Sequence, residues 1–469
     1  MRRRGRMDPR GSRATQPSDR SAPLGVPPAT WLAQAAEDLR QVGDPQQIAR
    51  LAVLRARAGD RPGTHQSLRD LRAALNDVRE PAVRIYCEIM RIETLWRLGQ
   101  GVRSRRDAAR LETTAEKDYA HAASRGRSEW TLSALAHAYA RVGDVNGVND
   151  ALDRMRRLGI RTDETVRTLS PLLPLAEARA ILTRFSTLSG LELLDVQLEV
   201  GDIDAARRTV EGFEEARTRP QGHLNLAHAA LDHGDSAGAA RDLAVVVNLR
   251  TKVGRGNAEL LVEVVEACVR LGDERGRRRA LQTALAELRR TTNWGARAYA
   301  SAHLASLCDG PERRDLFRRA LAVQRDIAEA GDPWGASFVA KVIAQHQLRA
   351  GDLAGARRTR TRVSHPDLAT MLTTSIVEFH LTRRKFDAAR DEARGAMSES
   401  RPRATSYPRL AASTLLPALA RIAHEQARAG ELVEVACWVN RLRSPLRRAA
   451  TRMAVAAALL GLRSDPWNP

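Results

Sequence analysis

The chain contains few residue combinations that could carry out catalysis or bind a metal. His223, His228 and His233 lie five residues apart in a helical pattern. Zinc-binding helices place two ligands four residues apart, whereas steps of five drift around the helix axis. We therefore expect these histidines to be partly exposed helix residues, and the sequence predicts no metal site.

One serine has neighbours that are typical of a catalytic nucleophile. Ser236 lies within Gly-Asp-Ser-Ala-Gly at residues 234–238. A nucleophile of that kind needs a sharp turn between a strand and a helix, and no strand pattern precedes this segment. The chain also lacks the GxxxxGK[ST] and GxGxxG loops that hold phosphates. We predict that the protein is not an enzyme and has no cofactor.

The cysteines and the hydropathy limit where the protein can act. Cys87, Cys268, Cys308 and Cys437 are far apart, and no CxxC pair exists to form a zinc ribbon or a thioredoxin-like site. Buried free thiols in a reducing cytoplasm are the expected state. No run approaches the roughly 20 apolar residues that span a bilayer, so we predict no membrane partner.

The composition favours helices. The 469 residues are 43% hydrophobic but only 4% aromatic, with alanine, leucine and arginine dominant. Strands favour β-branched and aromatic residues, so an array of helices fits better than a β-sandwich. The formal charge is +20, which suggests a polyanion as partner. All but four of the 76 basic residues are arginine, which is equally typical of a GC-rich bacterial genome.

A Gly-Asp pair recurs after alanine- and leucine-rich helical patterns. Intervals such as the 33 residues from Gly201 to Gly234 indicate stacked helical hairpins. Glycine can adopt the left-handed conformation that ends one helix, and the following aspartate can cap the next helix. The pairs begin at Gly43, Gly59, Gly143, Gly201, Gly234, Gly272, Gly331 and Gly351, with Gly430-Glu431 as a variant.

Small residues recur at fixed distances from these turns. An alanine lies five residues after the turn glycine at Ala206, Ala239 and Ala356, and Ala389 takes this place after the altered turn Arg384-Lys385-Phe386. A large apolar residue and then an alanine precede the glycine by eight and seven residues at Leu135-Ala136, Leu226-Ala227, Ile343-Ala344 and Ile422-Ala423. With these features the chain resembles the tetratricopeptide repeat (TPR) family.

This resemblance implies an all-α fold, a right-handed α-solenoid of stacked antiparallel helical hairpins that forms a TPR-like superhelix. At this period we expect about ten to twelve hairpins, and the terminal units should be the weakest. The first helix of each hairpin would line a concave groove that binds a protein or peptide. Helical phase suggests His137, Asn225, His228, Gln345 and Arg421 as groove positions.

One unit resembles a related family more closely. Residues 130–163 resemble a pentatricopeptide repeat through Tyr139, Gly143, Met155 and the ending Gly-Ile-Arg-Thr-Asp. In that family one residue near the start and the closing aspartate read an RNA base, here Ser133 and Asp163. Such a code needs several consecutive repeats, and the sequence contains one. We interpret the unit as divergence within a helical array.

Exposed arginines recur seven residues after the turn glycine. Because equivalent positions of stacked repeats align, they would form a ladder on the convex side. The ladder could bind a polyanion or an acidic protein, or it could be a solvated surface with local ion pairs. Its members are Arg208, Arg241, Arg279 and Arg358.

We predict four segments and one preferred function. Residues 1–30 form a disordered Arg/Pro-rich tail, 31–165 an N-terminal repeat block, 166–462 a C-terminal TPR-like block, and 463–469 a frayed end. The expected function is a non-catalytic scaffold that binds a protein or peptide. One alternative is an RNA- or DNA-binding array that uses its arginine-rich surface. Another is a peptide-sensing regulatory module that acts through a separate effector chain.

Overall fold

The protein is an all-α helical repeat protein. The computed structural model describes residues 26–121, 124–214, 218–250, 258–399 and 408–462. These residues contain twenty-four α-helices and the short 3₁₀ helix η2 (Ser170–Leu172), and no strand. The predicted stack of helical hairpins is confirmed. Apart from residues 26–30, the two predicted tails lie outside the described residues.

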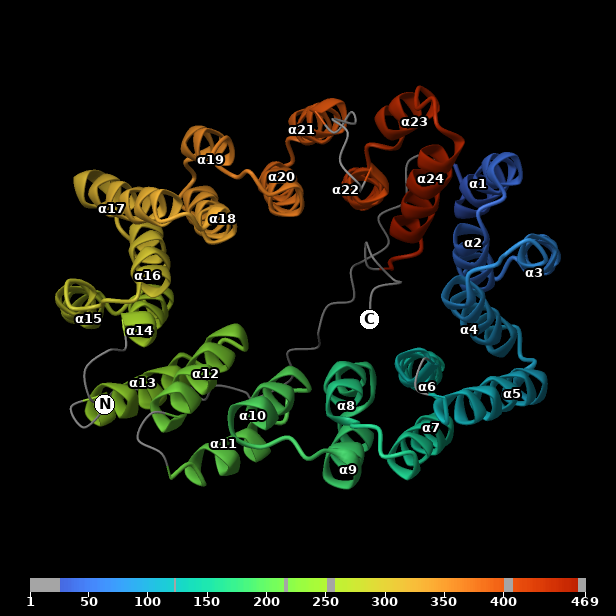
Figure 1. The fold of residues 1–469 in the computed structure, drawn as a ribbon, viewed down its shortest axis with the longest axis horizontal. Helices are drawn as coiled ribbons and strands as arrows, with labels where there is room; N and C mark the ends of the chain where they lie inside the picture. The colour runs from blue at the N-terminus through green and yellow to red at the C-terminus, as the bar shows by residue number, and fades with distance from the viewer. Residues whose placement is uncertain (1–25, 122–123, 215–217, 251–257, 400–407, 463–469) are drawn as a thin grey trace, which may run out of the picture.

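The helices form two concentric layers around a ring (Figure 1). Each even-numbered helix packs on the even-numbered helices before and after it, except that α8 reaches α10 through η2. These helices form the inner layer. They are α2 (Pro45–Arg57), α4 (Pro81–Arg97), α6 (Arg125–Val142), α8 (Asp163–Leu169), α10 (Gly190–Glu199), α12 (Thr218–Asp232), α14 (Ala258–Leu271), α16 (Trp294–Leu307), α18 (Pro333–Arg349), α20 (Pro366–Leu381), α22 (Pro408–Arg428) and α24 (Pro445–Leu459).

The odd-numbered helices cover the inner layer from outside, and from α3 onward each packs on the inner helix that precedes it. None of the helices in the described ranges is both long and apolar enough to cross a membrane. The outer helices are α1 (Pro28–Val42), α3 (Arg61–Leu75), α5 (Gly101–Tyr119), α7 (Val145–Arg157), α9 (Leu175–Phe185), α11 (Ile203–Glu211), α13 (Ser236–Arg250), α15 (Glu274–Leu288), α17 (Gly310–Glu329), α19 (Leu353–Arg360), α21 (Phe386–Glu399) and α23 (Leu432–Asn440).

The eight Gly-Asp pairs lie in the turns between helices, as predicted. Their glycines have φ between 69° and 84°, the left-handed region that favours glycine. Each aspartate accepts a hydrogen bond from the backbone N–H three residues later, at 2.7 to 3.2 Å. The pair therefore ends one helix and caps the next. Arg384 adopts this conformation without being glycine, at φ 54°.

The small residues that follow the turns lie where helices approach each other closely. Ala206, Ala239, Ala356 and Ala389 are all fully buried. The large–small pairs that precede the turns, such as Ile343-Ala344, are buried too. Alanine at these positions lets the second helix of a hairpin pack closely on the first. In these four hairpins the local pattern thus explains how the second helix fits against the first.

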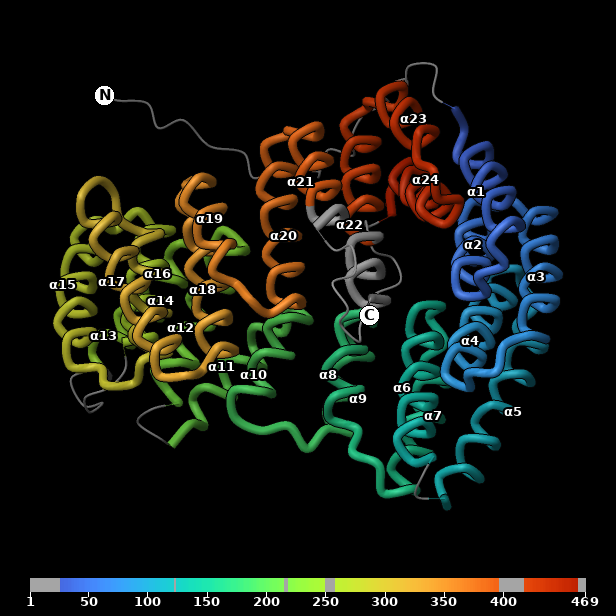
Figure 2. Tube along the Cα trace, turned by 45° about the horizontal axis from the view of Figure 1, so that its top comes forward, coloured from blue at the N-terminus to red at the C-terminus, as the bar shows by residue number. Residues whose placement is uncertain are grey.

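The first and last helices of the described chain pack against each other, and this contact closes the ring (Figures 1 and 2). Helix α1 covers α24 in the way that α3 covers α2, so the twelfth helix pair is built from both ends of the chain. One hydrophobic cluster contains Trp31 and Leu32 from α1 together with Met453 and Val455 from α24. The ends thus give each other the neighbour that an open stack would lack.

The hydrophobic core is continuous through much of the ring. One cluster runs from Ile89 to Val196, and another runs from Leu224 to Ile343. Every hairpin therefore buries its apolar face against its neighbours, which is the source of stability in repeat proteins. The division into two repeat blocks at residue 165 stays a prediction.

Candidate functional site

Polar side chains join successive inner helices along much of the ring. All five positions that helical phase suggested for the groove take part. His137 contacts Thr168 on α8 at 2.8 Å, and His228 contacts Arg270 on α14 at 3.2 Å. Asn225 donates to Asp195 on α10, and Gln345 donates to Ser375 on α20. Arg421 pairs with Glu378 on α20 at 3.6 Å.

A compact titratable cluster lies on α14, α16 and α18. The imidazoles of His303 and His346 stack with ring centroids 4.7 Å apart, and Tyr299 meets both edge-on. The His303 Nε2 lies 2.8 Å from the Glu266 carboxylate. This hydrogen bond lowers the pKa of Glu266 to about 2. Burial, assisted by the charges of His303 and Arg349, lowers the pKa of His346 to about 3.

The lowered pKa values determine the charge state of two members of this cluster. Glu266 is ionised and His346 is neutral at physiological pH, so a fixed carboxylate lies at one side of the buried, stacked imidazoles of His303 and His346. Within the described ranges, no three His, Cys, Asp or Glu side chains are placed to hold a metal ion. The spaced histidines do not converge, because His223 contacts Asp242 whereas His228 contacts Arg270.

Large apolar side chains are exposed on α18 and α20. Trp334 is 57% exposed and Phe338 is 41% exposed on α18, where their rings stack with centroids 5.5 Å apart. Lys341 Nζ lies 5.2 Å from the centre of the Phe338 ring. Met371 on α20 is 51% exposed. Phe338 is two turns from Gln345 and Met371 one turn from Ser375, so both lie on the face that carries the Gln345–Ser375 contact.

That face points into the ring. Helix α18 is flanked by α16 and α20 in the inner layer and covered from outside by α17 and α19. Among the described residues, these four helices leave uncovered the side of α18 that faces the ring interior. Trp334 and Phe338 therefore form an apolar surface on the inner layer, with Lys341 next to Phe338 and Gln345 two turns farther along the same face. We call Trp334, Phe338 and Met371 the inner apolar patch.

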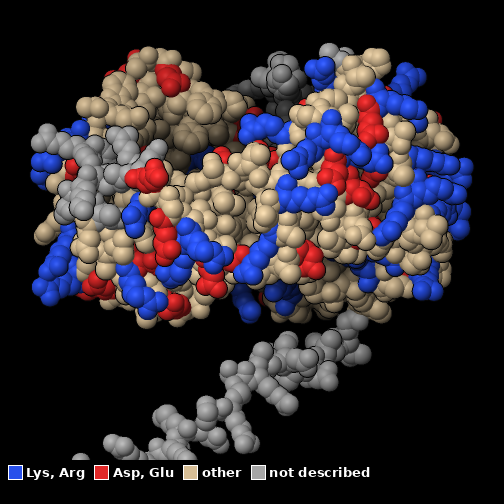
Figure 3. All heavy atoms as spheres, turned by 90° about the horizontal axis from the view of Figure 1, so that it is seen from below, with Lys and Arg blue, Asp and Glu red and all other residues tan. Residues whose placement is uncertain are grey.

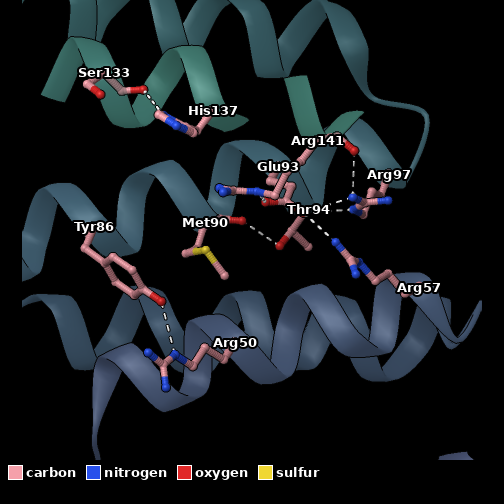
Figure 4. Close-up of polar contacts among 10 residues, drawn as sticks. All are labelled: Arg50, Arg57, Tyr86, Met90, Glu93, Thr94, Arg97, Ser133, His137 and Arg141. Carbon is pink, nitrogen blue, oxygen red and sulfur yellow. Dashed lines mark hydrogen bonds and ion pairs between the residues drawn. The ribbon is translucent and has the colours of Figure 1, made fainter. Parts of the chain in front are cut away.

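A buried carboxylate connects three inner helices (Figure 4). Glu93 on α4 is 2% exposed and contacts Arg57 of α2, Arg97 of α4 and Arg141 of α6, at 3.4, 3.0 and 2.9 Å. Burial opposes ionisation, but the three guanidinium groups outweigh it and hold the pKa of Glu93 below its ordinary value. The arginines stand at helix C-terminal ends, whose dipoles also favour positive charge. Glu93 thus holds α2, α4 and α6 together.

Glu93 is not among the residues predicted from the sequence. Glu93 and Arg97 are four residues apart and look like an ordinary surface ion pair of one helix. The available signal was the position of Glu93 on the face that carries Ile89 and Met90, both of which are buried. An acidic residue on an apolar face requires a buried partner. The sequence does not indicate which arginines supply it.

The four ladder arginines lie on the outer helices α11, α13, α15 and α19, and all four are exposed. Within the described residues, none of their side chains makes an ion pair or hydrogen bond. Their neighbours do, as Arg207 pairs with Asp242 at 3.2 Å and Arg278 pairs with Glu274 at 2.9 Å. The ladder is interrupted at α17, where Asp315 lies six residues after the N-terminal residue Asp309, just as Arg279 lies six residues after Asp273 of α15. The ladder members are Arg208, Arg241, Arg279 and Arg358.

The outer surface carries both signs of charge. Figure 3 views the side on which α7, α9 and α11 lie, and Lys and Arg are scattered there among Asp and Glu. This face therefore shows no uninterrupted basic band. The exposed arginines act as separate charges, and their immediate surroundings decide what each one can bind.

Two ladder arginines line grooves between neighbouring outer helices. Arg208 lines a polar groove of about 590 Å³ between α9 and α11, where Arg179 forms an ion pair with Asp202. Arg279 lines an apolar groove of about 510 Å³ between α13 and α15. Helical phase predicted an outer face for these arginines. The grooves were not predicted, because they depend on the separation of neighbouring outer helices.

The serine and the two base-reading positions considered in the sequence lie in helix turns or form hydrogen bonds within the protein. Ser236 is the first residue of α13, directly after the capping residue Asp235. Ser133 accepts a hydrogen bond from Thr165 at 3.0 Å, and Asp163 accepts one from the Thr187 backbone at 2.7 Å. The two positions that would read a base are therefore engaged within the protein.

The cysteines differ in burial. Cys87, Cys268 and Cys308 are buried, as expected, but Cys437 is exposed. Burial raises the pKa of Cys87 to about 12 and that of Cys308 to about 11. These two thiols therefore stay protonated at physiological pH and pack as small apolar side chains.

No protein-family model matches the chain, and no curated protein matches its sequence. Among solved structures, the chain is similar to a Rap protein complexed with competence and sporulation factor, with 12% identity, 91% of this chain and 100% of that chain covered, and a TM-score of 0.32. It is also similar to a circular tandem repeat protein with novel repeat topology, with 17% identity, 90% and 98% covered, and a TM-score of 0.18. Similarities this low assign no function to the chain.

Proposed function

We propose that the protein is a non-catalytic scaffold that binds a segment of a partner protein along the inner helices of the ring. The observation that carries this proposal is the inner apolar patch. Exposed large apolar side chains that cluster on one face mark interaction sites in soluble proteins. Here they lie on α18 and α20, next to side chains that can bond to a peptide backbone.

The surroundings of the patch favour an extended or helical segment with at least one large apolar side chain. The stacked rings of Trp334 and Phe338 offer a flat apolar surface, which an aromatic or aliphatic side chain can cover. Lys341 and Gln345 supply donors for backbone carbonyls. Farther along the inner layer, on α14, the Glu266 carboxylate supplies an acceptor. Rigid packing of the inner helices keeps these groups in place before the partner arrives, which lowers the entropy cost of binding.

Site-specific photo-crosslinking tests the proposal. A photoreactive phenylalanine analogue at Phe338 should crosslink to a defined segment of one protein in native cells, and Trp334→Ala should reduce the yield. The matched control is the analogue at Val433, which is 72% exposed on the outer helix α23 and should give no such product. Equal products from both positions, or none from Phe338, would contradict an inner binding surface.

The four exposed ladder arginines, which form no ion pair within the described ranges, favour nucleic acid as a second candidate partner. Phosphate contacts release counterions, so such binding weakens steeply with salt. Purification from native lysate with and without nuclease tests this candidate. Three results together would support nucleic acid as the partner. Nucleic acid copurifies with the wild type, it dissociates at about 0.2–0.5 M salt, and it is absent from a variant in which all four arginines are replaced. Absence of bound nucleic acid at low salt would exclude it.

A further inference from the structure

The groove between α13 and α15 has an apolar floor and two unlike walls. Its floor is the inner helix α14, which contributes Val264, Cys268 and Leu271. Leu243 and Val247 of α13 extend this apolar surface, and Val247 is 50% exposed. An opening of about 510 Å³ that is lined by inner-layer side chains can receive several apolar side chains of a partner.

The α13 wall suits close approach of another helix. Ala240 and Ala244 lie one helical turn apart on this wall. Small side chains at that spacing let the backbone of another helix approach α13 closely. Alanine has the same effect within hairpins of this protein, for example at the buried Ala239. The groove also runs between two helices that already belong to the outer layer. A helix laid between them would continue that layer.

The α15 wall carries unsatisfied positive charge. Arg275 and Arg279 lie one turn apart and both line the groove. Both are exposed, and neither side chain forms an ion pair or hydrogen bond in the described chain. Elsewhere on α15, Arg277 and Arg278 both pair with Glu274. The one acidic residue that lines the groove, Asp273, accepts from the Gly276 backbone as the cap of α15.

We propose that this groove is a docking site for an acidic amphipathic helix of a partner protein. The apolar face of that helix would cover Val247, Val264 and Leu271. Two acidic side chains one turn apart would meet Arg275 and Arg279, since residues four apart on either helix are separated by about 6 Å along the axis. The site lies on the outer layer and does not depend on the inner apolar patch.

A designed peptide tests the site directly. The probe is a fluorescein-labelled helical peptide of about 18 residues, or five turns, with leucines along one face and two glutamates one turn apart beside them. Fluorescence anisotropy with the full-length protein should show saturable binding. A matched peptide with lysines in place of both glutamates should bind at least about tenfold more weakly, because close charge pairs at an interface supply at least that factor.

Protein variants identify the groove as the binding site. Combined Arg275→Glu and Arg279→Glu should weaken the glutamate peptide at least about tenfold and strengthen the lysine peptide. Ala244→Trp, which fills the groove, should weaken both peptides. The matched control Arg358→Glu changes an exposed, unpaired arginine on α19 and should leave binding unchanged. Phe338→Ala should also have no effect, which separates this site from the inner surface.

Three results would overturn the proposal. The first is the absence of saturable binding by the glutamate peptide. The second is equal affinity of the glutamate and lysine peptides for the wild type, which would mean that Arg275 and Arg279 do not recognise acidic side chains. The third is unchanged binding in Ala244→Trp when circular dichroism shows the wild-type helix content, since the peptide would then bind elsewhere.

Discussion

Asp38 of α1 and Arg448 of α24 form a buried ion pair between the two ends of the described chain. The Asp38 carboxylate lies 2.8 Å from the Arg448 guanidinium and also pairs with Arg452. Asp38 is only 3% exposed. An acidic residue so deeply buried depends on both arginines for its stability. The pair therefore fixes how α1 docks on α24 and thereby closes the ring.

Replacing Asp38 should loosen the closure of the ring. Asp38→Ala leaves two partly buried arginines without their anion, and losing one partner of a buried ion pair costs about 3 kcal/mol or more. Hydrogen exchange should accelerate in α1 and α24 but not in α12, which lies far along the ring. The control Glu37→Ala removes an exposed pair with Arg40 and should change little. Unchanged exchange in α1 would contradict this role for Asp38.

Glu93→Gln should destabilise the protein at neutral pH by about 3 kcal/mol or more, because Arg57, Arg97 and Arg141 lose their shared anion. Urea unfolding of both proteins at matched pH measures the loss. The exposed Glu259 of α14 provides the matched control, and Glu259→Gln should unfold like the wild type. A stability of Glu93→Gln within about 0.5 kcal/mol of the wild type would show that the carboxylate does not hold the three helices together.

The same comparison has a defined pH dependence. The pKa of Glu93 is lowered in the folded protein. In the unfolded chain the pKa of a glutamate is about 4.3. Ionised Glu93 therefore contributes its full stability above the unfolded pKa, and this contribution is lost as pH falls through the folded pKa. The difference between wild type and Glu93→Gln should be largest near pH 7 and should shrink below about pH 4. A difference that grows on acidification would reverse the assigned sign.

Arg384→Gly should stabilise the protein. Arg384 has φ 54°, and a residue with a Cβ in the left-handed region is strained by about 1–2 kcal/mol. Glycine removes this strain, but it loses more backbone entropy on folding, which offsets part of the gain. We expect a net gain of about 0.5–1 kcal/mol in urea unfolding. Arg383→Gly is the matched control and should destabilise, because Arg383 lies over the Phe379 ring. A loss of stability in Arg384→Gly would show that the arginine side chain matters more than its backbone strain.

The sequence by itself determined the helical hairpin and its turn. Gly201 and Asp202 act within a few residues, since a left-handed glycine and a side-chain cap need only local backbone to form. Ala206 follows from the same register, because it is the small residue where the second helix crosses the first. Helical phase also placed Asn225 and Gln345 on the inner helices, because residues of one helical face stay together in any fold that keeps the helix.

Only the tertiary structure decided how the hairpins close into a ring and which side chains meet. The rotation between neighbouring hairpins depends on the fit of many side chains, and small differences accumulate around the ring until α1 reaches α24. His303 and His346 stack, and Glu93 gains Arg141, because helices distant in the chain become neighbours. Arg279 was recognisable as exposed, but its groove exists only because α13 and α15 stand apart over α14. Local backbone chemistry determines the repeat unit, whereas packing summed over the whole chain determines the surfaces that can bind a partner.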